Sequence, residues 1–212
     1  WEYQAVMKQD RATEIVVDWA DGTSVKMSAA QLYEIVFDGN NQWMLSANGT
    51  IFTYEFEGII PGLLKRWYAE RQEMQRKKAA CGDNEIERAY WDKRQLVKKI
   101  NLNSLYGAIL NPGCRFFDMR IGQSVTLTGR CITRHMGAKI NEIVAGKYDH
   151  TGESIVYGDT DSVYFSAYKT LKKDIDAGNI EWNKESVIAL YDKIADETNV
   201  TFPGFMQKAF HC

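Results

Sequence analysis

Proline is scarce in this sequence of 212 residues, which contains only 3. That scarcity excludes a proline-rich linker, a collagen-like repeat and a low-complexity tail. No apolar run approaches the roughly 18 residues that a membrane span requires. The first residues, 1–3, include no initiator methionine, no basic segment and no apolar segment. We therefore expect no signal peptide and a chain that begins inside a longer protein.

Cysteine is equally sparse, with 4 scattered residues and no C-x-x-C pair. So few cysteines in a chain of this length argue against a disulfide framework and favour free thiols in a reducing compartment. Cys131 and His135 lie one helical turn apart, so a helix would place both on one face as ligands for zinc. We disfavour this zinc site because the sequence contains no second pair of ligands.

The net charge of −2 conceals an uneven distribution of charge along the chain. Residues 61–100 carry a net charge of +5 and residues 101–150 carry +3, whereas residues 1–60 carry −6 and residues 151–212 carry −4. A basic central block can bind polyphosphate or a nucleic-acid backbone. The alternative is a solvated helix surface of mixed charge.

In the N-terminal part of the chain, short runs typical of β-strands alternate with turn residues, a pattern that predicts short β-hairpins. Strands are predicted at 14–19 and 24–27 around a turn, and at 43–45 and 51–54 around Asn48-Gly49. Ser28 is expected to cap a short helix over 29–37.

From residue 59 the apolar residues recur at helical spacing, which predicts a helix over 59–80. Pro61 suits the first turn of this helix. A break at 81–84 precedes a second long helix over 85–109. The two helices are expected to form an antiparallel αα-hairpin whose surface is dominated by lysine and arginine. A helix over 123–144, a β-hairpin over 154–166 and an amphipathic helix over 184–198 are predicted beyond it.

The 154–166 hairpin carries two carboxylates, Asp159 and Asp161, at its tip. Carboxylates this close repel each other, and Mg²⁺ would relieve the repulsion by binding them together with water and substrate phosphates. Gly158 permits backbone conformations that are closed to other residues. The alternative is a solvated acidic turn, since Asp and Gly are common turn residues.

The second long helix carries a cation, an amide, an aromatic ring and a glycine on one face: Lys99, Asn103, Tyr106 and Gly107. The first two suit phosphate oxygens, and the ring beside the glycine suits the close approach of a base pair. Ordinary amphipathicity with the tyrosine in the core is the alternative. Arg71, on the partner helix, is expected to reach the same polyphosphate as Lys99, unless it is a plain surface arginine.

These motifs, in this order, resemble those of the family B DNA polymerases, and most closely the replicative polymerases of large tailed phages. Residues 157–162, YGDTDS, resemble palm motif C, and residues 99–107, KINLNSLYG, resemble fingers motif B, K-x-x-x-N-S-x-Y-G. Residues 58–61 and 111–129 fit the same family.

The resemblance implies a role for each residue of the hairpin tip. Asp161 would ligate the catalytic metals, two Mg²⁺ ions in the intact enzyme, and Asp159 would support this catalytic site. Gly158 and Thr160 would adjoin the DNA.

The resemblance also implies roles on the two long helices. Lys99 and Asn103 would touch the incoming triphosphate, and Tyr106 and Gly107 would pack against the nascent base pair. Arg71 would be the first cation of the family's R-x-x-x-K fingers pattern.

The sequence departs from the family pattern in two respects. The position four residues after Arg71 is Gln75 rather than lysine, with Arg76 or Lys77 as substitutes. Motif A, D-x-x-S-L-Y-P, which supplies the other metal-binding aspartate and the tyrosine that excludes ribonucleotides, is absent. Asp18 and Asp38 are the best internal replacements for that aspartate, and we favour neither.

We therefore predict an α+β fold that joins part of a polymerase palm, an antiparallel sheet with helices on one face, to a long αα-hairpin fingers subdomain. The expected segments are palm at 1–57, fingers at 58–110, and palm with the catalytic hairpin at 111–212. The expected reaction of the intact enzyme is template-directed addition of dNTP to a primer 3′-OH by a two-metal mechanism. We expect the 212-residue chain to be inactive alone because motif A is absent.

The implied partners are primer-template DNA, dNTP and, through a region downstream of residue 212, a sliding clamp. No membrane is implied, and the expected location is the cytoplasm, that of the host cell if a phage encodes the chain. One rival interpretation is a non-catalytic nucleic-acid-binding module with a polymerase-like shape. Another, a reverse-transcriptase-like palm, is disfavoured because Thr160 separates the two aspartates.

Overall fold

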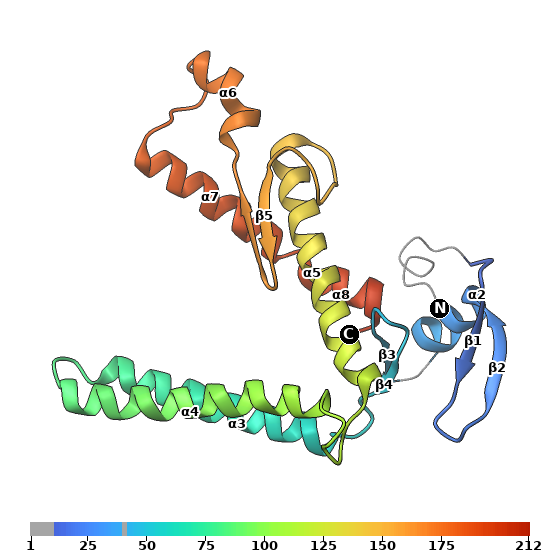
Figure 1. Ribbon diagram of the computed structural model, residues 1–212. Helices are drawn as coiled ribbons and strands as arrows, with labels where there is room; N and C mark the ends of the chain where they lie inside the picture. The colour runs from blue at the N-terminus through green and yellow to red at the C-terminus, as the bar shows by residue number, and fades with distance from the viewer. Residues whose placement is uncertain (1–10, 40–41) are drawn as a thin grey trace. The chain divides into compact units, whose positions relative to one another are not determined.

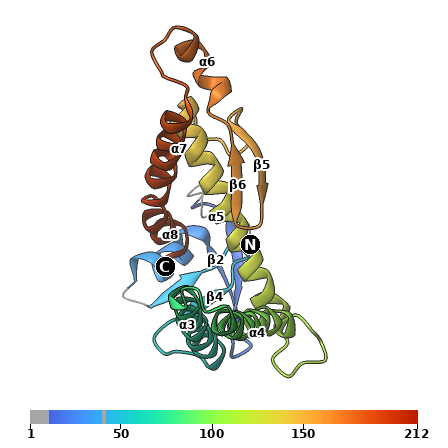
Figure 2. The same ribbon diagram turned by 90° about the vertical axis from the view of Figure 1, so that its left-hand side faces the viewer.

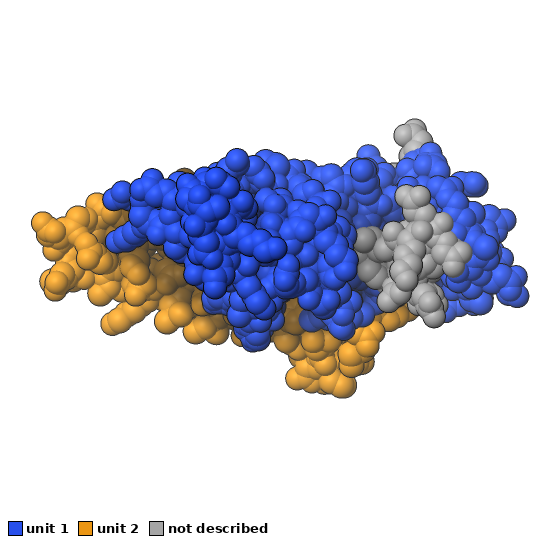
Figure 3. All heavy atoms as spheres, turned by 90° about the horizontal axis from the view of Figure 1, so that it is seen from above, with its two compact units in different colours: residues 1–52, 124–212 blue, residues 53–123 orange. Residues whose placement is uncertain are grey.

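The computed structural model describes residues 11–39 and 42–212 of the chain. The first ten residues of the expected 1–57 segment, and residues 40 and 41, lie outside the described residues. Short β-hairpins alternate with helices along the chain (Figure 1), which confirms a mixed α+β fold. The chain divides into two compact units, residues 1–52 with 124–212 and residues 53–123 (Figure 3).

The first hairpin pairs β1 (Glu14–Asp18) with antiparallel β2 (Ser24–Ser28). Ser28 then caps α2 (Ala29–Tyr33) through a capping box, in which its hydroxyl accepts from the Gln31 amide and the Gln31 side chain accepts from the Ser28 amide. The chain continues as the short π-helix η1 (Glu34–Asp38). The short helix that the sequence predicts is therefore present as two consecutive elements.

A small apolar core fixes this N-terminal region. Ile15, Leu32, Val36 and Leu45 are buried together, and they come from β1, α2, η1 and β3 (Trp43–Leu45). β3 pairs with β4 (Ile51–Thr53), and Gly49 in the connecting turn has a φ of 85°. The turn predicted at Asn48-Gly49 is confirmed, because glycine adopts this left-handed conformation without steric cost.

The second unit is dominated by α3 (Ile59–Ala80) and α4 (Glu85–Ile109). Both helices have the bounds that the sequence predicts. Asn84 caps α4 by accepting from the Glu87 amide at 3.1 Å. Ion pairs between the helices, at 2.5 Å for Lys98 with Glu70 and 2.7 Å for Lys78 with Asp92, hold them side by side as a hairpin.

The rest of the chain contains four more helices and a third hairpin in the described residues. α5 (Met119–Ala145) is followed by β5 (Ile155–Asp159), β6 (Ser162–Phe165), α6 (Tyr168–Asp176), α7 (Lys184–Asn199) and α8 (Phe202–Phe210). α5 begins earlier than predicted because the Asp118 carboxylate accepts from the Arg120 amide at 2.9 Å, which satisfies one of the free amides at its start.

The sequence did not predict α6 and α8. α6 is amphipathic but only 9 residues long, shorter than the window of about 11–18 residues over which helical periodicity is recognised. α8 begins with a proline in its first turn and ends at His211, which has a φ of 57°. Both helices are too short to be stable in isolation, so they depend on packing against the rest of the chain.

The β5–β6 hairpin lies against helices on one face. The hairpin runs beside α5 (Figure 2). Three side chains form a buried cluster under it: Ile140 of α5, Ala167, which precedes α6, and Ile194 of α7. Val163 and Phe165 of β6 pack against this cluster. The opposite face is exposed, since Tyr157 and Tyr164 retain 57% and 61% of their accessible surface. A one-sided hairpin of this kind keeps its tip in solvent while its inner face is fixed.

One expectation about the sheet is wrong. The β-structure of the described residues consists of three separate two-stranded antiparallel ladders rather than a single sheet. Each ladder closes through its own tight turn, and β1–β2 and β5–β6 pack against different apolar clusters. No helix in the described part of the chain is long and apolar enough to cross a membrane.

Candidate active site

The tip of the β5–β6 hairpin is a two-residue turn. Asp159 pairs with Ser162, so Thr160 and Asp161 form the turn itself. Thr160 has a φ of 48°, in the left-handed region that β-branched residues rarely adopt. Gly158 does not have a positive φ, so the conformational freedom that glycine offers there is not used, and the left-handed residue of the tip is Thr160.

The two carboxylates at the tip are exposed and form no ion pair with a described residue. Asp159 accepts from the Thr160 hydroxyl at 3.0 Å, and its backbone carbonyl accepts from the Ser162 hydroxyl at 3.2 Å. Since no cation of the described chain neutralises them, the carboxylates are available to a ligand. Carboxylate oxygens are the donors that Mg²⁺ prefers, and Mg²⁺ completes its shell with water and phosphate oxygens.

The tip alone does not form a closed metal site. Among the described residues, no group of three or more His, Cys, Asp or Glu side chains is arranged to hold a metal. Asp18 and Asp38 therefore do not supply a third carboxylate to Asp159 and Asp161. Asp18 instead accepts from the Ser24 hydroxyl at 2.6 Å within the β1–β2 hairpin.

A helix supports the tip from outside the hairpin. The Thr133 hydroxyl of α5 donates to the backbone carbonyl of Thr160 at 2.7 Å. The sequence analysis missed Thr133, because a threonine inside a helix has no local signal that marks it as a contact to a strand turn.

Arg71 of α3 is half-buried at the seam between the two long helices rather than free on the surface. Its Nε donates to Gln95 Oε1 of α4 at 3.3 Å. Gln95 precedes Lys99 by one helical turn, so the guanidinium group lies near the lysine-bearing stretch of α4. The antiparallel pairing of the helices therefore places Arg71 beside the turn of α4 that precedes Lys99.

The predicted face of α4 is only partly as expected. Lys99, Asn103 and Gly107 are exposed, and an added Cβ at Gly107 would meet no atom within 4 Å. Tyr106 is half-buried, and its hydroxyl donates to the Gly122 carbonyl at 3.0 Å. The tyrosine ring is thus anchored by a hydrogen bond while the other three residues remain accessible.

Gly122 is a second residue that the sequence analysis missed. An added Cβ there would lie 1.9 Å from Cδ2 of Leu110, so a larger residue would require the Leu110 side chain to move. The close approach of Leu110 fixes the start of α5 relative to the end of α4, and it places the Gly122 carbonyl within reach of Tyr106.

The two proposed substitutes for a lysine at position 75 differ in their surroundings. Lys77 pairs with Glu73 at 2.8 Å and lies 4.8 Å above the ring of Trp91. The hydrogen bond from Lys77, together with the charge of Arg76, lowers the pKa of Glu73. Arg76 is exposed and has no ion pair within 4.0 Å among the described residues.

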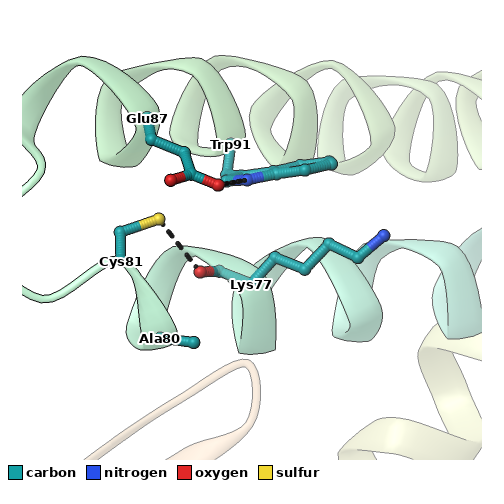
Figure 4. Close-up of a pocket in the computed structure, with 5 residues that line it drawn as sticks. All are labelled: Lys77, Ala80, Cys81, Glu87 and Trp91. Carbon is teal, nitrogen blue, oxygen red and sulfur yellow. Dashed lines mark hydrogen bonds between the residues drawn. The ribbon is translucent and has the colours of Figure 1, made fainter.

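A pocket of about 280 Å³ lies at the turn end of the α3–α4 hairpin. Its lining residues are Lys77, Ala80, Cys81, Glu87 and Trp91 (Figure 4). The Cys81 thiol donates to the Lys77 carbonyl at 3.1 Å, and burial raises the pKa of this thiol. None of the predicted nucleotide-binding residues lines this pocket.

The Cys131 and His135 pair does not form a zinc site. Both ring nitrogens of His135 are bonded, Nδ1 to the Tyr148 hydroxyl at 2.8 Å and Nε2 to the Thr201 hydroxyl at 2.9 Å. The Thr201 hydroxyl donates its proton to the Thr198 carbonyl at 2.6 Å, so it accepts from Nε2, and Tyr148 donates to Nδ1. His135 is therefore a neutral structural residue with no free nitrogen for a metal.

Comparison with known proteins adds independent information on these motifs. The family described as DNA polymerase family B matches residues 16–189, which include the hairpin tip and both long helices. That match covers well over half of the chain.

Individual relatives agree with the family match. The chain is 39% identical over 80 residues to the DNA-directed DNA polymerase of Escherichia phage RB69, over 37% of this chain and 9% of that protein. It is 40% identical over 82 residues to the DNA-directed DNA polymerase of Enterobacteria phage T4, with the same two shares. It is 31% identical over 159 residues to the DNA polymerase of Pyrococcus glycovorans, over 75% of this chain and 19% of that protein. The chain therefore spans less than a fifth of the length of each of these relatives.

Proposed function

This chain belongs to DNA polymerase family B, and we propose that it forms part of the palm and the fingers of a template-directed DNA polymerase. The reaction is the addition of a dNTP to the 3′-OH of a primer. The names of the phage and archaeal relatives, all DNA polymerases, support this assignment. The substrates are then dNTP and primer-template DNA, and a sliding clamp is a partner of the complete enzyme.

The observation that carries the proposal is the pair of exposed carboxylates at the β5–β6 tip. Asp159 and Asp161 have no cationic partner in the described chain, although lysine and arginine are abundant in it. A two-residue hairpin turn requires a positive φ at its first position, and here a β-branched threonine rather than a glycine takes that position, with support from Thr133. The tip is therefore built to hold carboxylates in a defined place.

The donor chemistry of the tip fits Mg²⁺. Asp161 would hold the metal and Asp159 would support it, with the remaining ligands supplied by water, substrate and a motif A aspartate that this sequence lacks. When bound, two such ions lower the pKa of the primer hydroxyl and stabilise the charge of the departing pyrophosphate.

The residues of the α3–α4 hairpin bind and orient the nucleotide in this proposal. Lys99 and Arg71 neutralise the triphosphate, and Asn103 hydrogen-bonds to it. Gly107 leaves open space for the base pair, and the bonded ring of Tyr106 offers a fixed surface beside it. Gly158 and Thr160 lie against the primer-template DNA. Movement of this hairpin onto a correctly paired nucleotide would test fit before the reaction.

The test is the substitution Asp161→Asn in a polymerase that contains this chain. We expect primer extension to fall by roughly a thousandfold or more, since the lost ligand contributes several kcal/mol to transition-state stabilisation. Binding of primer-template DNA should change little. Asp176→Asn, at an exposed position of α6, is the matched control and should retain activity.

Two outcomes would contradict the proposal. Near-normal extension by Asp161→Asn would favour the non-catalytic nucleic-acid-binding module. Primer extension by the purified 212-residue chain with Mg²⁺ would contradict the expectation that the chain is inactive without a motif A aspartate.

A further inference from the structure

Thr133 makes a hydrogen bond that no local secondary structure requires. Its hydroxyl donates across 27 positions of sequence to the Thr160 carbonyl at 2.7 Å. The other side-chain hydrogen bonds of the tip, from Thr160 to Asp159 and from Ser162 to Asp159, stay within the hairpin. In the described chain, Thr133 is thus the one side chain outside the hairpin that hydrogen-bonds to residues 159–162.

The carbonyl that Thr133 contacts belongs to the most strained residue of the tip. Thr160 has a φ of 48°, and a β-branched side chain in this region persists only when the surroundings hold it there. The peptide group that contains this carbonyl leads directly into Asp161. A bond that fixes the orientation of this peptide group therefore restricts the directions in which the Asp161 side chain can leave the backbone.

The bond is favourable for the tip but dispensable for α5. Thr133 has one hydroxyl proton and two acceptors, the Thr160 carbonyl at 2.7 Å and the Gly129 carbonyl of its own helix at 3.1 Å. Without the tip bond, the hydroxyl can return to Gly129, as threonine commonly does inside helices. Loss of the hydroxyl should consequently disturb the hairpin tip more than the helix.

We propose that Thr133 is a positioning residue that holds Thr160 in its left-handed conformation and thereby aims the Asp161 carboxylate. The inference deepens the proposed function and rests on it for the role of Asp161 as a metal ligand. The structural part, the dependence of the Thr160 conformation on Thr133, stands separately. The Thr133 contact acts on the metal only through the orientation of Asp161, so Thr133 itself touches neither metal nor substrate.

The first measurement is the conformation of Thr160 in the 212-residue chain by NMR. The variants are Thr133→Val, which keeps the shape and removes the donor, and Thr133→Ser, which keeps the donor. We expect the amide-to-α-proton coupling of Thr160 to move from its left-handed value towards an extended value in Thr133→Val and to stay unchanged in Thr133→Ser. Thr133→Ala is the second donor-free variant if the valine variant does not fold.

The second measurement is the binding of Mn²⁺, a paramagnetic substitute for Mg²⁺, followed by line broadening at the Asp161 amide. Residues that orient a metal ligand typically change metal affinity by about tenfold or more, so we expect a loss of about tenfold in Thr133→Val and rescue in Thr133→Ser. Asp161→Asn is the control that should abolish the broadening without altering the Thr160 coupling. The unfolding midpoints of the threonine variants should agree with that of the unsubstituted chain.

The possible outcomes distinguish the positioning role of Thr133 from the proposed metal-binding role of Asp161. Unchanged Thr160 coupling and unchanged Mn²⁺ affinity in Thr133→Val would overturn the positioning role. A loss of affinity accompanied by general destabilisation, without rescue by serine, would also overturn it. A change in Thr160 coupling when Mn²⁺ does not bind even the unsubstituted chain would support the positioning of the tip and count against its proposed metal role.

Discussion

Two hairpins of this chain carry the candidate chemistry, and they are stabilised differently. The β5–β6 hairpin rests on a cluster of fully buried side chains from α5, α7 and the residue before α6. The α3–α4 hairpin has no buried residue in α3 and only Ile109 in α4, so its two helices meet along a half-exposed seam of aromatic and polar side chains. The hairpin that carries Asp159 and Asp161 is therefore supported by buried apolar side chains. The hairpin that carries Arg71 and Lys99 is supported by contacts that remain partly exposed to solvent.

This difference in burial indicates how firmly the carboxylates of the β5–β6 tip and the cations of the α3–α4 hairpin are held in place. Local opening costs most where apolar contacts are dense and least where hydrogen bonds are exposed. Arg71 depends on a single long hydrogen bond to Gln95, and Lys99 is exposed. The tip of the β-hairpin is fixed by a strained turn and a bond from a neighbouring helix. The carboxylate element is accordingly the more rigid of the two.

The largest change in the free energy of unfolding is expected from a substitution in the buried cluster that supports the β5–β6 hairpin. Ile194→Ala removes a side chain that is only 3% exposed, and such cavities cost about 2–5 kcal/mol of unfolding free energy. Leu105→Ala, at a half-buried position of α4, should cost only about 1 kcal/mol. Urea unfolding of both variants measures the difference. Equal costs would show that the two hairpins are not stabilised differently.

The next prediction tests whether the α3–α4 hairpin binds the nucleotide. Lys99→Ala, in a polymerase that contains this chain, should raise the KM for dNTP by about tenfold, because a charge-assisted phosphate contact is worth about 1.5–3 kcal/mol. Lys93→Ala, also an exposed lysine of α4, is the matched control and should leave the KM unchanged. A similar rise in both variants would indicate a general loss of positive charge rather than a specific contact.

A smaller effect depends on pH and tests the unit that contains α5. Burial lowers the pKa of His135, and the nearby Lys139 charge adds to this effect. Because the folded-state pKa lies below the ordinary value of about 6.5, the unfolded chain takes up a proton more readily. The contribution of neutral His135 to the free energy of unfolding should therefore be complete above about pH 6.5. It should decrease as the pH falls below that value.

Urea unfolding at pH 7.5 and 5.5 measures this loss. His135→Gln should reduce the difference between the two pH values, whereas His150→Gln, at an exposed position, should not. An identical pH dependence in the His135 variant would assign the loss to other groups.

The smallest expected change in stability is that of Gly158→Ala. An added Cβ would meet the Ser162 carbonyl oxygen at 3.7 Å, an ordinary contact, and Gly158 has no positive φ, so unfolding free energy should change by less than about 0.5 kcal/mol. Binding of primer-template DNA should nevertheless weaken, because the proposed role of Gly158 is to let DNA approach. Unchanged DNA affinity would remove Gly158 from the proposed DNA surface.

Much of the local structure was predictable from the sequence. The bounds of α3 and α4 follow from apolar periodicity and from the break at 81–84, and the turns of the β-hairpins follow from their glycine and aspartate residues. Capping by Ser28 was likewise readable from a single side chain. These features depend on neighbours within a few positions, which is why sequence reasoning reached them.

Other features were not predictable. The sequence offered Gly158 as a residue that permits unusual backbone conformations, but the positive φ of the tip falls on Thr160, because the pairing register places the turn at Thr160 and Asp161. The single sheet expected for the palm is absent from the described residues, where β1–β2 and β5–β6 pack against different apolar clusters. Register and packing are decided between segments, so no local pattern reveals them.

The sequence by itself determined the family, the order of the motifs, the two long helices and the carboxylates at a hairpin tip. Only the tertiary structure decided that Thr133 supports Thr160, that Gln95 holds Arg71, and that both nitrogens of His135 are occupied. The physical reason is that a hydroxyl, an amide or an imidazole has the same donors and acceptors at any position in a helix. Its partner is chosen only when packing brings distant segments within hydrogen-bonding distance.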